Sequence, residues 1–263
     1  MNEVRVESWN QLNDCLYEGA WREDLGRFRS YTAFRGMSNS RYDLRTGISR
    51  MAGASEGLED AILRAFQKYA HHGASAGDST WNWLAMAQHH GLMTRLLDWT
   101  YSGYVALHFV TEDLDHYDVD GIIWAVDYLK TNTLLPRKLR QVLEQEGSHV
   151  FTADMLSKAA GSLKEFDSLS RDPFVAFFEP PSLDARIVNQ YALFSLVSSP
   201  ATELDDWLQQ HPETFRRYVI PAELKWEVRD KLDQANITER VLYPGLDGLG
   251  RWIKRYYTPR VRP

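Results

Sequence analysis

Cysteine is almost absent from this 263-residue sequence, in which Cys15 is the only one. A single cysteine excludes an intramolecular disulfide and a zinc site built from cysteines, and it fits a reducing compartment. The sequence also lacks a run of roughly 18 apolar residues, the length needed to cross a membrane, and its first residues contain no apolar core of the signal-peptide kind. We therefore expect no signal peptide and no membrane span, and we predict a cytoplasmic protein.

An excess of positive charge is missing too. Asp and Glu outnumber Lys and Arg by 36 to 30, which gives a net charge of −6. This balance disfavours duplex-DNA binding through bulk electrostatics but leaves room for a local basic patch. Hydrophobic residues make up 44% of the chain, enough for a substantial core. We find no linker, repeat or low-complexity run, so residues 1–263 are interpreted as a single domain.

The common signatures of enzyme chemistry are missing as well. The sequence has no P-loop, no GxGxxG dinucleotide fingerprint, no GxSxG nucleophile elbow and no HExxH metal motif. The nearest approach to a metal site is given by two histidine pairs, His71-His72 and His89-His90. Adjacent side chains point to different sides of a helix or strand, so neither pair easily places both rings on one ion. We predict no metal site.

Short alternating or apolar segments, separated by turn residues, predict a mixture of strands and helices. The pattern favours an α+β domain with a mixed, mainly antiparallel β-sheet core flanked by helices. Expected strands cover residues 4–9, 31–34, 121–127, 172–181, 191–197 and 216–221. Expected helices cover residues 9–21, with Ser8 as the N-cap, then 56–69, 81–88, 104–110, 202–209 and 221–235, followed by a last basic helix.

The densest group of polar residues is the stretch QHHGLMTRLLDWT, residues 88–100. Burying its charged side chains without partners would cost several kcal/mol, so the stretch is either a hydrogen-bonded junction or a ligand site. Asp98 and Thr100 are also N-cap candidates for the apolar helix that follows, and a helix N-terminus attracts anions. Arg95 and Asp98 stand three residues apart, so a buried ion pair between them is the structural alternative.

The strongest local cationic cluster precedes this stretch. It consists of Arg35, Arg41, Arg45 and Arg50, which fall within sixteen residues. A solvated arginine-rich loop is one interpretation. Binding of a phosphate-bearing ligand is the other, because a guanidinium holds phosphate through two parallel hydrogen bonds.

Three pieces of the chain can meet around one ligand if the predicted strands share a sheet. They are Arg35 at the end of a strand, Trp99-Thr100 before the apolar helix, and Gln190 at the start of a later strand. Arg35 would bind phosphate, Trp99 would stack on a ring and Gln190 would hydrogen-bond a ribose hydroxyl. An anionic, ribose-bearing ligand is therefore one hypothesis.

The same segments resemble those of a known family. YTAFRG, QHHGLMTRLLDWTYSGYVALHFV and DARIVNQYALFSL are similar, in order and spacing, to the signature segments of the FRG domain. That domain is named for its Phe-Arg-Gly motif, which here is Phe34-Arg35-Gly36. The resemblance covers residues 28–197, and residues 221–263 look like the family's C-terminal helical extension.

The order of these motifs is similar to that of the ADP-ribosyltransferases whose first motif is an arginine, which implies an ADP-ribosyltransferase-like fold and NAD as a substrate. The resemblance implies that Arg35 and Gly36 hold the NAD phosphates and that Gln190 stands at the catalytic position. Glu179 is the carboxylate that would supply the charge that Gln190 lacks, since the transition state resembles an oxocarbenium ion. The other residues implied at the NAD site are His90, Arg95, Asp98, Trp99 and Thr100.

The activity implied by the resemblance is cleavage of the nicotinamide–ribose bond of NAD, with ADP-ribose passed to a protein, a nucleic acid or water. Such an enzyme would act as a bacterial toxin or a phage-defence effector. Glutamine carries no charge, however, and fold-level analogy does not establish activity. The alternative is a non-catalytic module that binds a nucleotide or a nucleic acid.

Overall fold

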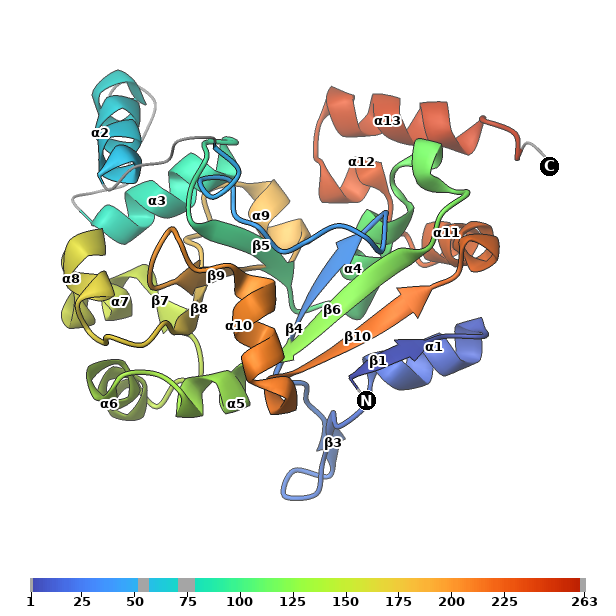
Figure 1. Ribbon diagram of the computed structural model, residues 1–263. Coiled ribbons are helices and arrows are strands. Elements are labelled where there is room, and N and C mark those ends of the chain that lie inside the picture. The colour runs from blue at the N-terminus through green and yellow to red at the C-terminus, as the bar shows by residue number, and fades with distance from the viewer. Residues whose placement is uncertain (1, 52–56, 71–78, 261–263) are drawn as a thin grey trace.

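The computed structural model describes residues 2–51, 57–70 and 79–260. Most of its strands join one eight-stranded sheet in the order β1-β10-β6-β4-β5-β9-β8-β7. Neighbouring strands are antiparallel except β1 with β10 and β7 with β8, which are parallel. Figure 1 shows the sheet running through the middle of the molecule with helices around it. The predicted α+β class with a mixed, mainly antiparallel sheet is confirmed.

The strands of the large sheet are β1 (Glu3–Arg5), β4 (Thr32–Met37), β5 (Leu96–Thr100), β6 (Gly121–Asp127), β7 (Phe151–Thr152), β8 (Val175–Glu179), β9 (Ala192–Val197) and β10 (Phe215–Ile220). A separate two-stranded ribbon consists of β2 (Trp21–Arg22) and β3 (Arg27–Phe28). The strand predicted over residues 121–127 coincides with β6. Its side chains are buried on both faces apart from Asp127, which explains its unbroken apolar run.

The helices are α1 (Trp9–Leu16), α2 (Leu58–Ala70), α3 (Thr80–His89), α4 (Gly103–Thr111), α5 (Tyr128–Thr133), α6 (Arg137–Glu146), α7 (Ala153–Ala159), α8 (Leu163–Asp167), α9 (Ala185–Asn189), α10 (Leu204–Gln210), α11 (Lys225–Gln234), α12 (Glu239–Leu242) and α13 (Leu246–Tyr256). Three short 3₁₀ helices are η1 (Leu114–His116), η2 (Pro212–Thr214) and η3 (Ala222–Leu224). Ser8 caps α1 as predicted, but α1 ends well before Trp21, because the chain turns through Gly19 with φ +69°. Within the described ranges, no helix has both the length and the apolar character needed to cross a membrane.

The cap of α4 differs from the sequence-based expectation. Ser102 is the N-cap, and its hydroxyl accepts a hydrogen bond from Val105 N at 3.3 Å. Asp98 and Thr100, the predicted cap candidates, lie within β5 instead. Ser102 immediately precedes the first helical residue and has the extended backbone geometry that an N-cap residue adopts.

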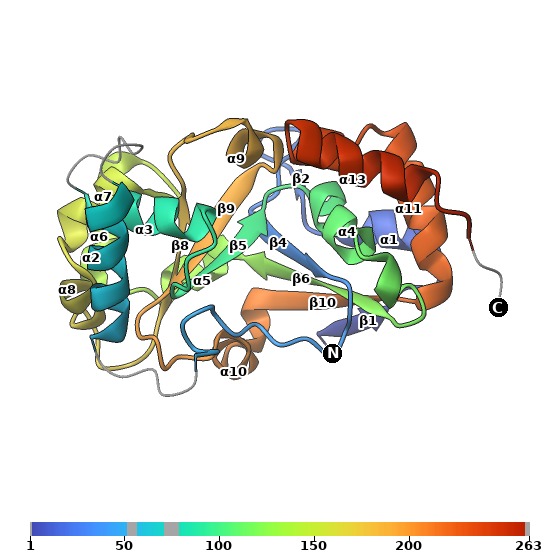
Figure 2. The ribbon, with the colours of Figure 1, turned by 90° about the horizontal axis from the view of Figure 1, so that it is seen from above.

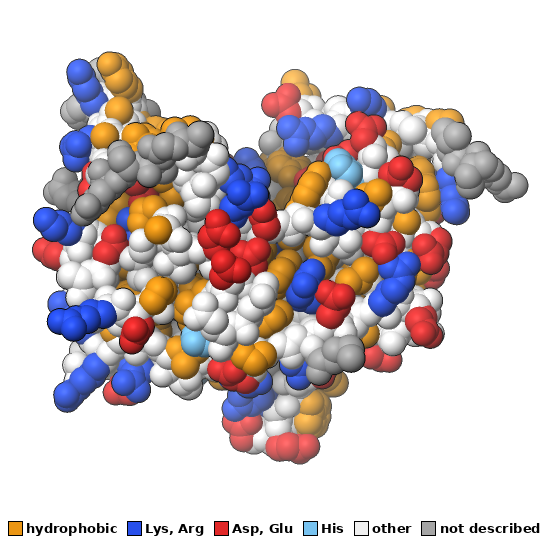
Figure 3. Space-filling model, in the orientation of Figure 1, with side chains coloured by type: hydrophobic (Ala, Val, Ile, Leu, Met, Phe, Trp, Pro, Cys, Tyr) orange, Lys and Arg blue, Asp and Glu red, His pale blue; other side chains and the backbone are white. Residues whose placement is uncertain are grey.

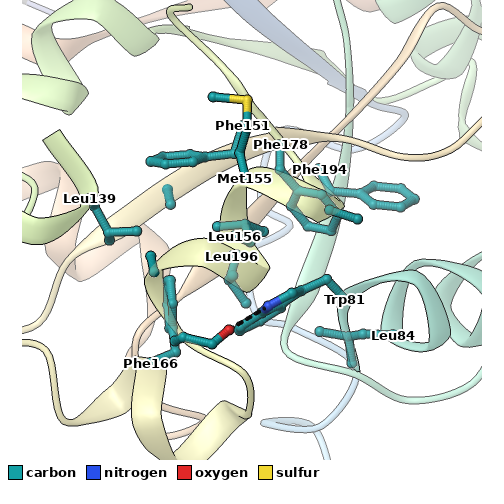
Figure 4. Packing of buried hydrophobic residues seen from close by; sticks show 14 of the residues in the cluster. Trp81, Leu84, Leu139, Phe151, Met155, Leu156, Phe166, Phe178, Phe194 and Leu196 are labelled. Atoms are coloured by element: carbon teal, nitrogen blue, oxygen red, sulfur yellow. Dashed lines mark hydrogen bonds between the residues drawn. The ribbon is translucent and has the colours of Figure 1, made fainter. Parts of the chain in front are cut away.

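Three clusters of buried apolar side chains stabilise the sheet. One lies under α1, α4 and α11, and another lies among α2, α3, α6, α7 and α8 at the opposite end of the molecule (Figure 2). The third spans both halves of the sheet. Figure 4 shows the second cluster, where the fully buried Trp81 donates its Nε1 hydrogen to Ala160 O at 2.9 Å. Burial of such a side chain contributes about 3 kcal/mol.

The two central strands, β4 and β5, barely pair. Their register contains one residue pair, Phe34 opposite Thr100, whereas β4 pairs with β6 over six residues and β5 with β9 over five. Beyond that pair the two strands diverge, as Figure 1 shows. The sheet therefore opens between its two halves.

Gly36 lies where α4 crosses β4, and a Cβ added there would stand 1.8 Å from Ala106 O. Gly36→Ala must push α4 away from the sheet, so we expect the free energy of unfolding to fall by about 3 kcal/mol. Urea denaturation followed by tryptophan fluorescence measures this change.

Gly250→Ala is the matched control, since a Cβ there meets no atom within 4 Å. Alanine also favours the interior of α13 over glycine by up to about 1 kcal/mol, so this variant should be as stable as the wild type or slightly more stable. An unchanged urea midpoint for Gly36→Ala would contradict the close approach of α4 to β4.

Candidate functional site

A pocket of about 580 Å³ opens where β4 and β5 separate, and we term it the arginine pocket. Its lining includes five arginines, namely Arg35, Arg41, Arg45, Arg50 and Arg186, and three carboxylates, those of Asp43, Asp98 and Glu112. Figure 3 shows the surface hollowed between the two halves of the molecule, with basic side chains at the edge of the hollow. Its volume falls within the range of roughly 300–1,000 Å³ that is typical of small-molecule sites.

Arg35 lies on β4 one residue beyond the pair with β5, so its side chain reaches the open part of the sheet. Nη1 donates to Asp98 O at 2.6 Å, whereas Nε is buried and has no hydrogen-bond partner among the described residues. Burial lowers the pKa of the guanidinium; attraction to Asp98 opposes this shift and repulsion from Arg50 adds to it. An arginine stays protonated through such a shift, so the pocket holds a charge that an anion would stabilise.

The loop after β4 is held in place by its own ion pairs. Arg45 Nε lies 2.7 Å from Asp43 Oδ2, and Arg50 Nη2 lies 3.6 Å from Oδ1 of the same carboxylate. Burial would raise the pKa of Asp43, but the hydrogen bond from Arg45 keeps it below its usual value. The structure thus brings the four arginines that cluster in the sequence to one pocket.

Asp98 is an exposed carboxylate within a central strand whose other side chains are buried. Gln88 Nε2 donates to Asp98 Oδ2 at 2.9 Å, and Gln88 Oε1 accepts from Thr94 Oγ1 at 2.6 Å. This chain of hydrogen bonds fixes the carboxylate of Asp98, and Asp98 is part of the pocket lining. Asp98 can therefore stabilise a positive charge that develops in a bound ligand.

Gln190 and Thr100 lie side by side at the start of β9. Thr100 Oγ1 donates to Gln190 O at 2.8 Å, so the buried threonine hydroxyl serves this junction. Gln190 is the C-cap of α9 rather than a residue of β9, and its Nε2 donates to Leu242 O at 3.1 Å. Gln190 is one of the residues that line the arginine pocket, and its predicted role at a ribose stays a prediction.

Trp99 is among the residues that line the arginine pocket, but the burial of its ring argues against the hypothesis that it stacks on a ligand. Its side chain is 3% exposed, packs against Phe177 and donates its Nε1 hydrogen to Ser195 Oγ at 2.9 Å. Side chains alternate between the faces of a strand, so the outward position of Asp98 turns Trp99 toward the core. Gly36 lines the pocket. The structure explains the glycine at this position by the close approach of α4, which leaves no room for a Cβ.

Arg95 does not line the arginine pocket and is 3% exposed in a buried ion cluster. Its Nε lies 2.6 Å from Glu59 Oε2, and its Nη1 pairs with Asp167. Burial raises the pKa of Glu59 in spite of the attraction to Arg95. The predicted ion pair with Asp98 is wrong, because α2 and α8 supply both partners of Arg95.

The histidines of the polar stretch lie outside the arginine pocket. His90 is exposed, and its ring centroid stands 5.1 Å from that of His89. His89 Nε2 lies 2.8 Å from Asp184 Oδ2. The pair His71-His72 falls outside the described residues. Across residues 2–51, 57–70 and 79–260, no group of three or more side chains could hold a metal ion.

Glu179 lines a second pocket rather than the arginine pocket. The carboxylates that share a pocket with Arg35 include Glu112, which the sequence analysis did not place at the ligand site. Glu112 ends α4 and accepts a hydrogen bond from Tyr243 OH at 3.0 Å. Arg186 was also not predicted, although its position within the DARIVNQ segment was an available indication.

The family model of the FRG domain matches residues 30–119 of this chain. The match supports the assignment to the FRG family. The matched residues contain β4, the loop after it that carries Arg41, Arg45 and Arg50, then β5 and α4. Gln190 lies beyond the match. Searches of curated proteins and of solved structures gave no match.

Replacement of Arg95 by methionine tests the structural role of the buried ion cluster. Arg95→Met leaves the Glu59 carboxyl buried without its partner, so we expect the free energy of unfolding to fall by about 3–5 kcal/mol. The double variant Arg95→Met/Glu59→Gln should recover part of this loss, because no unpaired buried charge remains at residue 59. Urea midpoints of the three proteins measure both effects. Full stability of Arg95→Met would contradict the structural assignment.

Proposed function

We propose that the arginine pocket binds NAD and that the chain is an ADP-ribosyltransferase-like enzyme, which breaks the bond between nicotinamide and ribose. The proposal depends on one observation, the meeting of Arg35, Asp98 and Gln190 in a pocket at the split of the sheet. They offer a cation for phosphate, a carboxylate and an amide. A dinucleotide with a reacting ribose can use all three groups.

Arg35 supports the phosphate end of the proposal. Its bond to Asp98 O holds the guanidinium in the split, while the buried Nε has no partner among the described residues. Arg41, Arg45 and Arg50 line the same pocket and add positive potential. A diphosphate at this place would also offset the repulsion between Arg35 and Arg50.

Asp98 supports the reacting end. When nicotinamide leaves with the electron pair of the C1′–N bond, positive charge develops on the ribose; the acceptor then forms a bond to C1′ and releases a proton. A carboxylate beside the ribose stabilises that charge. Asp98 takes the role expected of Glu179, because Asp98 shares the pocket with Arg35 and Glu179 does not. The Oε1 atom of Gln190 would accept a hydrogen bond from a ribose hydroxyl, since Nε2 already donates to Leu242 O.

Nicotinamide release from NAD by the purified protein tests this proposal. We expect release by the wild type and a fall in kcat of about 100-fold for Asp98→Asn, which removes the charge and keeps the shape. Arg35→Ala should lose the rise in melting temperature that NAD gives to the wild type, because the phosphate anchor is gone.

The control is Arg140→Ala, which removes an arginine from the exposed face of α6, away from the pocket, and should behave as the wild type. Melting temperatures without ligand are measured first, since Arg35→Ala also removes the hydrogen bond to Asp98 O. A wild type that neither releases nicotinamide nor is stabilised by NAD would overturn the proposal.

A nucleotide- or nucleic-acid-binding module without catalysis is the second candidate. The observation that favours it is the exposure of Arg41, Arg45 and Arg50, which line the pocket where a phosphate backbone could reach them. The uncharged amide of Gln190 is consistent with binding alone.

This second candidate predicts a steep salt dependence. For a single-stranded RNA oligonucleotide, the logarithm of the affinity should fall with the logarithm of salt concentration by about 0.7 per phosphate contact. Arg41→Ala should reduce the slope by about one contact. Fluorescence anisotropy between about 50 and 200 mM salt measures the slope. Absence of binding, or a slope that Arg41→Ala leaves unchanged, would exclude the nucleic-acid candidate.

A further inference from the structure

A second pocket of about 430 Å³ lies beside the arginine pocket and has no part in the proposed reaction. Its lining includes four tyrosines, Tyr31, Tyr101, Tyr128 and Tyr191, together with Glu179. We term it the tyrosine pocket. The two pockets adjoin along the chain, because Gln190 lines the arginine pocket and the next residue, Tyr191, lines the tyrosine pocket.

The tyrosine rings form a box rather than a stack. The ring centroid of Tyr101 stands 4.9 Å from that of Tyr191 and 6.1 Å from that of Tyr128. Tyr128 in turn lies 5.9 Å from Tyr31, with the ring planes at 89°. Tyr128 is buried in the core, whereas Tyr191 is largely exposed, so a ligand can reach the Tyr191 ring and not that of Tyr128. The face of an aromatic ring attracts cations.

Glu179 adds a negative charge to this box. Its Oε1 accepts a hydrogen bond from Tyr101 OH at 2.9 Å, which fixes the carboxylate at the pocket. Among the described residues, no lysine or arginine forms an ion pair with it. Burial, followed by the charge of Glu179, raises the pKa of Tyr101, so the hydroxyl stays neutral and keeps donating.

Tyr191 has a backbone conformation that is unusual for a tyrosine. Its φ is +50°, in the left-handed region that a bulky side chain rarely adopts. Tyr191 directly follows Gln190, the C-cap of α9, and a left-handed residue at this place is a common way to end a helix. This turn leaves the ring 59% exposed, with its centroid 4.9 Å from that of Tyr101.

One of the tyrosines, Tyr31, already contacts a guanidinium of this chain. The Cζ of Arg22 lies 5.0 Å from the centroid of the Tyr31 ring, and the two residues line a different pocket together. Arg29 lines the tyrosine pocket itself, and its Nη1 donates to Phe28 O at 3.2 Å. Arg29 therefore adds a competing positive charge to the tyrosine pocket.

We propose that the tyrosine pocket binds the guanidinium of an arginine side chain on a protein partner. The planar group can lie against the rings of Tyr101 and Tyr191 while its forked donors reach the Glu179 carboxylate. This binding does not depend on what the arginine pocket holds. If NAD binds there, the two ligands would contact consecutive residues of the chain, Gln190 and Tyr191, and that relation alone rests on the proposed function.

Titration with N-acetyl-arginine amide, followed by NMR of the tyrosine rings, tests the proposal without NAD. We expect roughly millimolar affinity, as befits one side chain. The uncharged isostere N-acetyl-citrulline amide should bind at least about five-fold more weakly, and Glu179→Gln should weaken arginine binding by a similar factor. The glutamine can still accept the hydrogen bond from Tyr101, so this variant isolates the charge.

Tyr191→Asn removes the ring but suits the left-handed backbone, since asparagine tolerates positive φ. We expect this variant to lose arginine binding and to keep its melting temperature, whereas Arg29→Ala should bind arginine more tightly because a competing positive charge is gone. Equal binding of citrulline, wild-type affinity in Glu179→Gln or Tyr191→Asn, or no binding of either probe would overturn the proposal. Tighter binding of free arginine than of the blocked amide would overturn the assignment to a protein side chain.

Discussion

The architecture depends on the single residue pair that joins β4 to β5. The pair of Phe34 with Thr100 keeps the eight strands in one sheet, and the separation beyond it creates the arginine pocket. On that side of β5 the backbone has lost its neighbouring strand, and a buried carbonyl without a donor would be costly. Arg35 supplies the donor at Asp98 O, so one side chain both closes the gap in the ladder and places its charge in the pocket.

The loop after β4, which carries Arg41, Arg45 and Arg50, is hydrogen-bonded on both sides of this split. Lys225, which is fully buried on α11, donates to Ser38 O at 2.6 Å where the loop begins, and burial lowers the pKa of its amine to about 8. Near the other end, Ile48 N donates to Thr94 O at 3.1 Å. At neutral pH the lysine is still mostly protonated and continues to donate. A loop whose backbone is held at both ends loses less backbone freedom when it binds a ligand.

How far the sequence predicts the site depends on the range of the interactions involved. The strand over residues 121–127 follows from a local pattern, and the structure reproduces it. The strand before the arginine cluster was also predicted, but β4 runs on to Met37, so Arg35 lies within the strand and not at its end. The sequence did not predict which face of the strand Trp99 lies on. Leu96 and Leu97 are both apolar, so the alternation of apolar and polar residues does not show which positions face the core. The partners of Arg95 lie 36 and 72 residues away, beyond any local pattern.

The charges of the arginine pocket bear on the choice between the two candidate functions. A carboxylate beside arginines weakens the binding of a ligand that is purely anionic, because the like charges repel at short range. Asp98 nevertheless lines the pocket, and its carboxylate is fixed by Gln88, which Thr94 orients in turn. A phosphate backbone gains nothing from this arrangement. A ligand with phosphates at one end and a positive or developing positive charge at the other uses both signs, and oxidised NAD is a ligand of that kind. The fixed carboxylate therefore favours the NAD-cleaving enzyme over the nucleic-acid module.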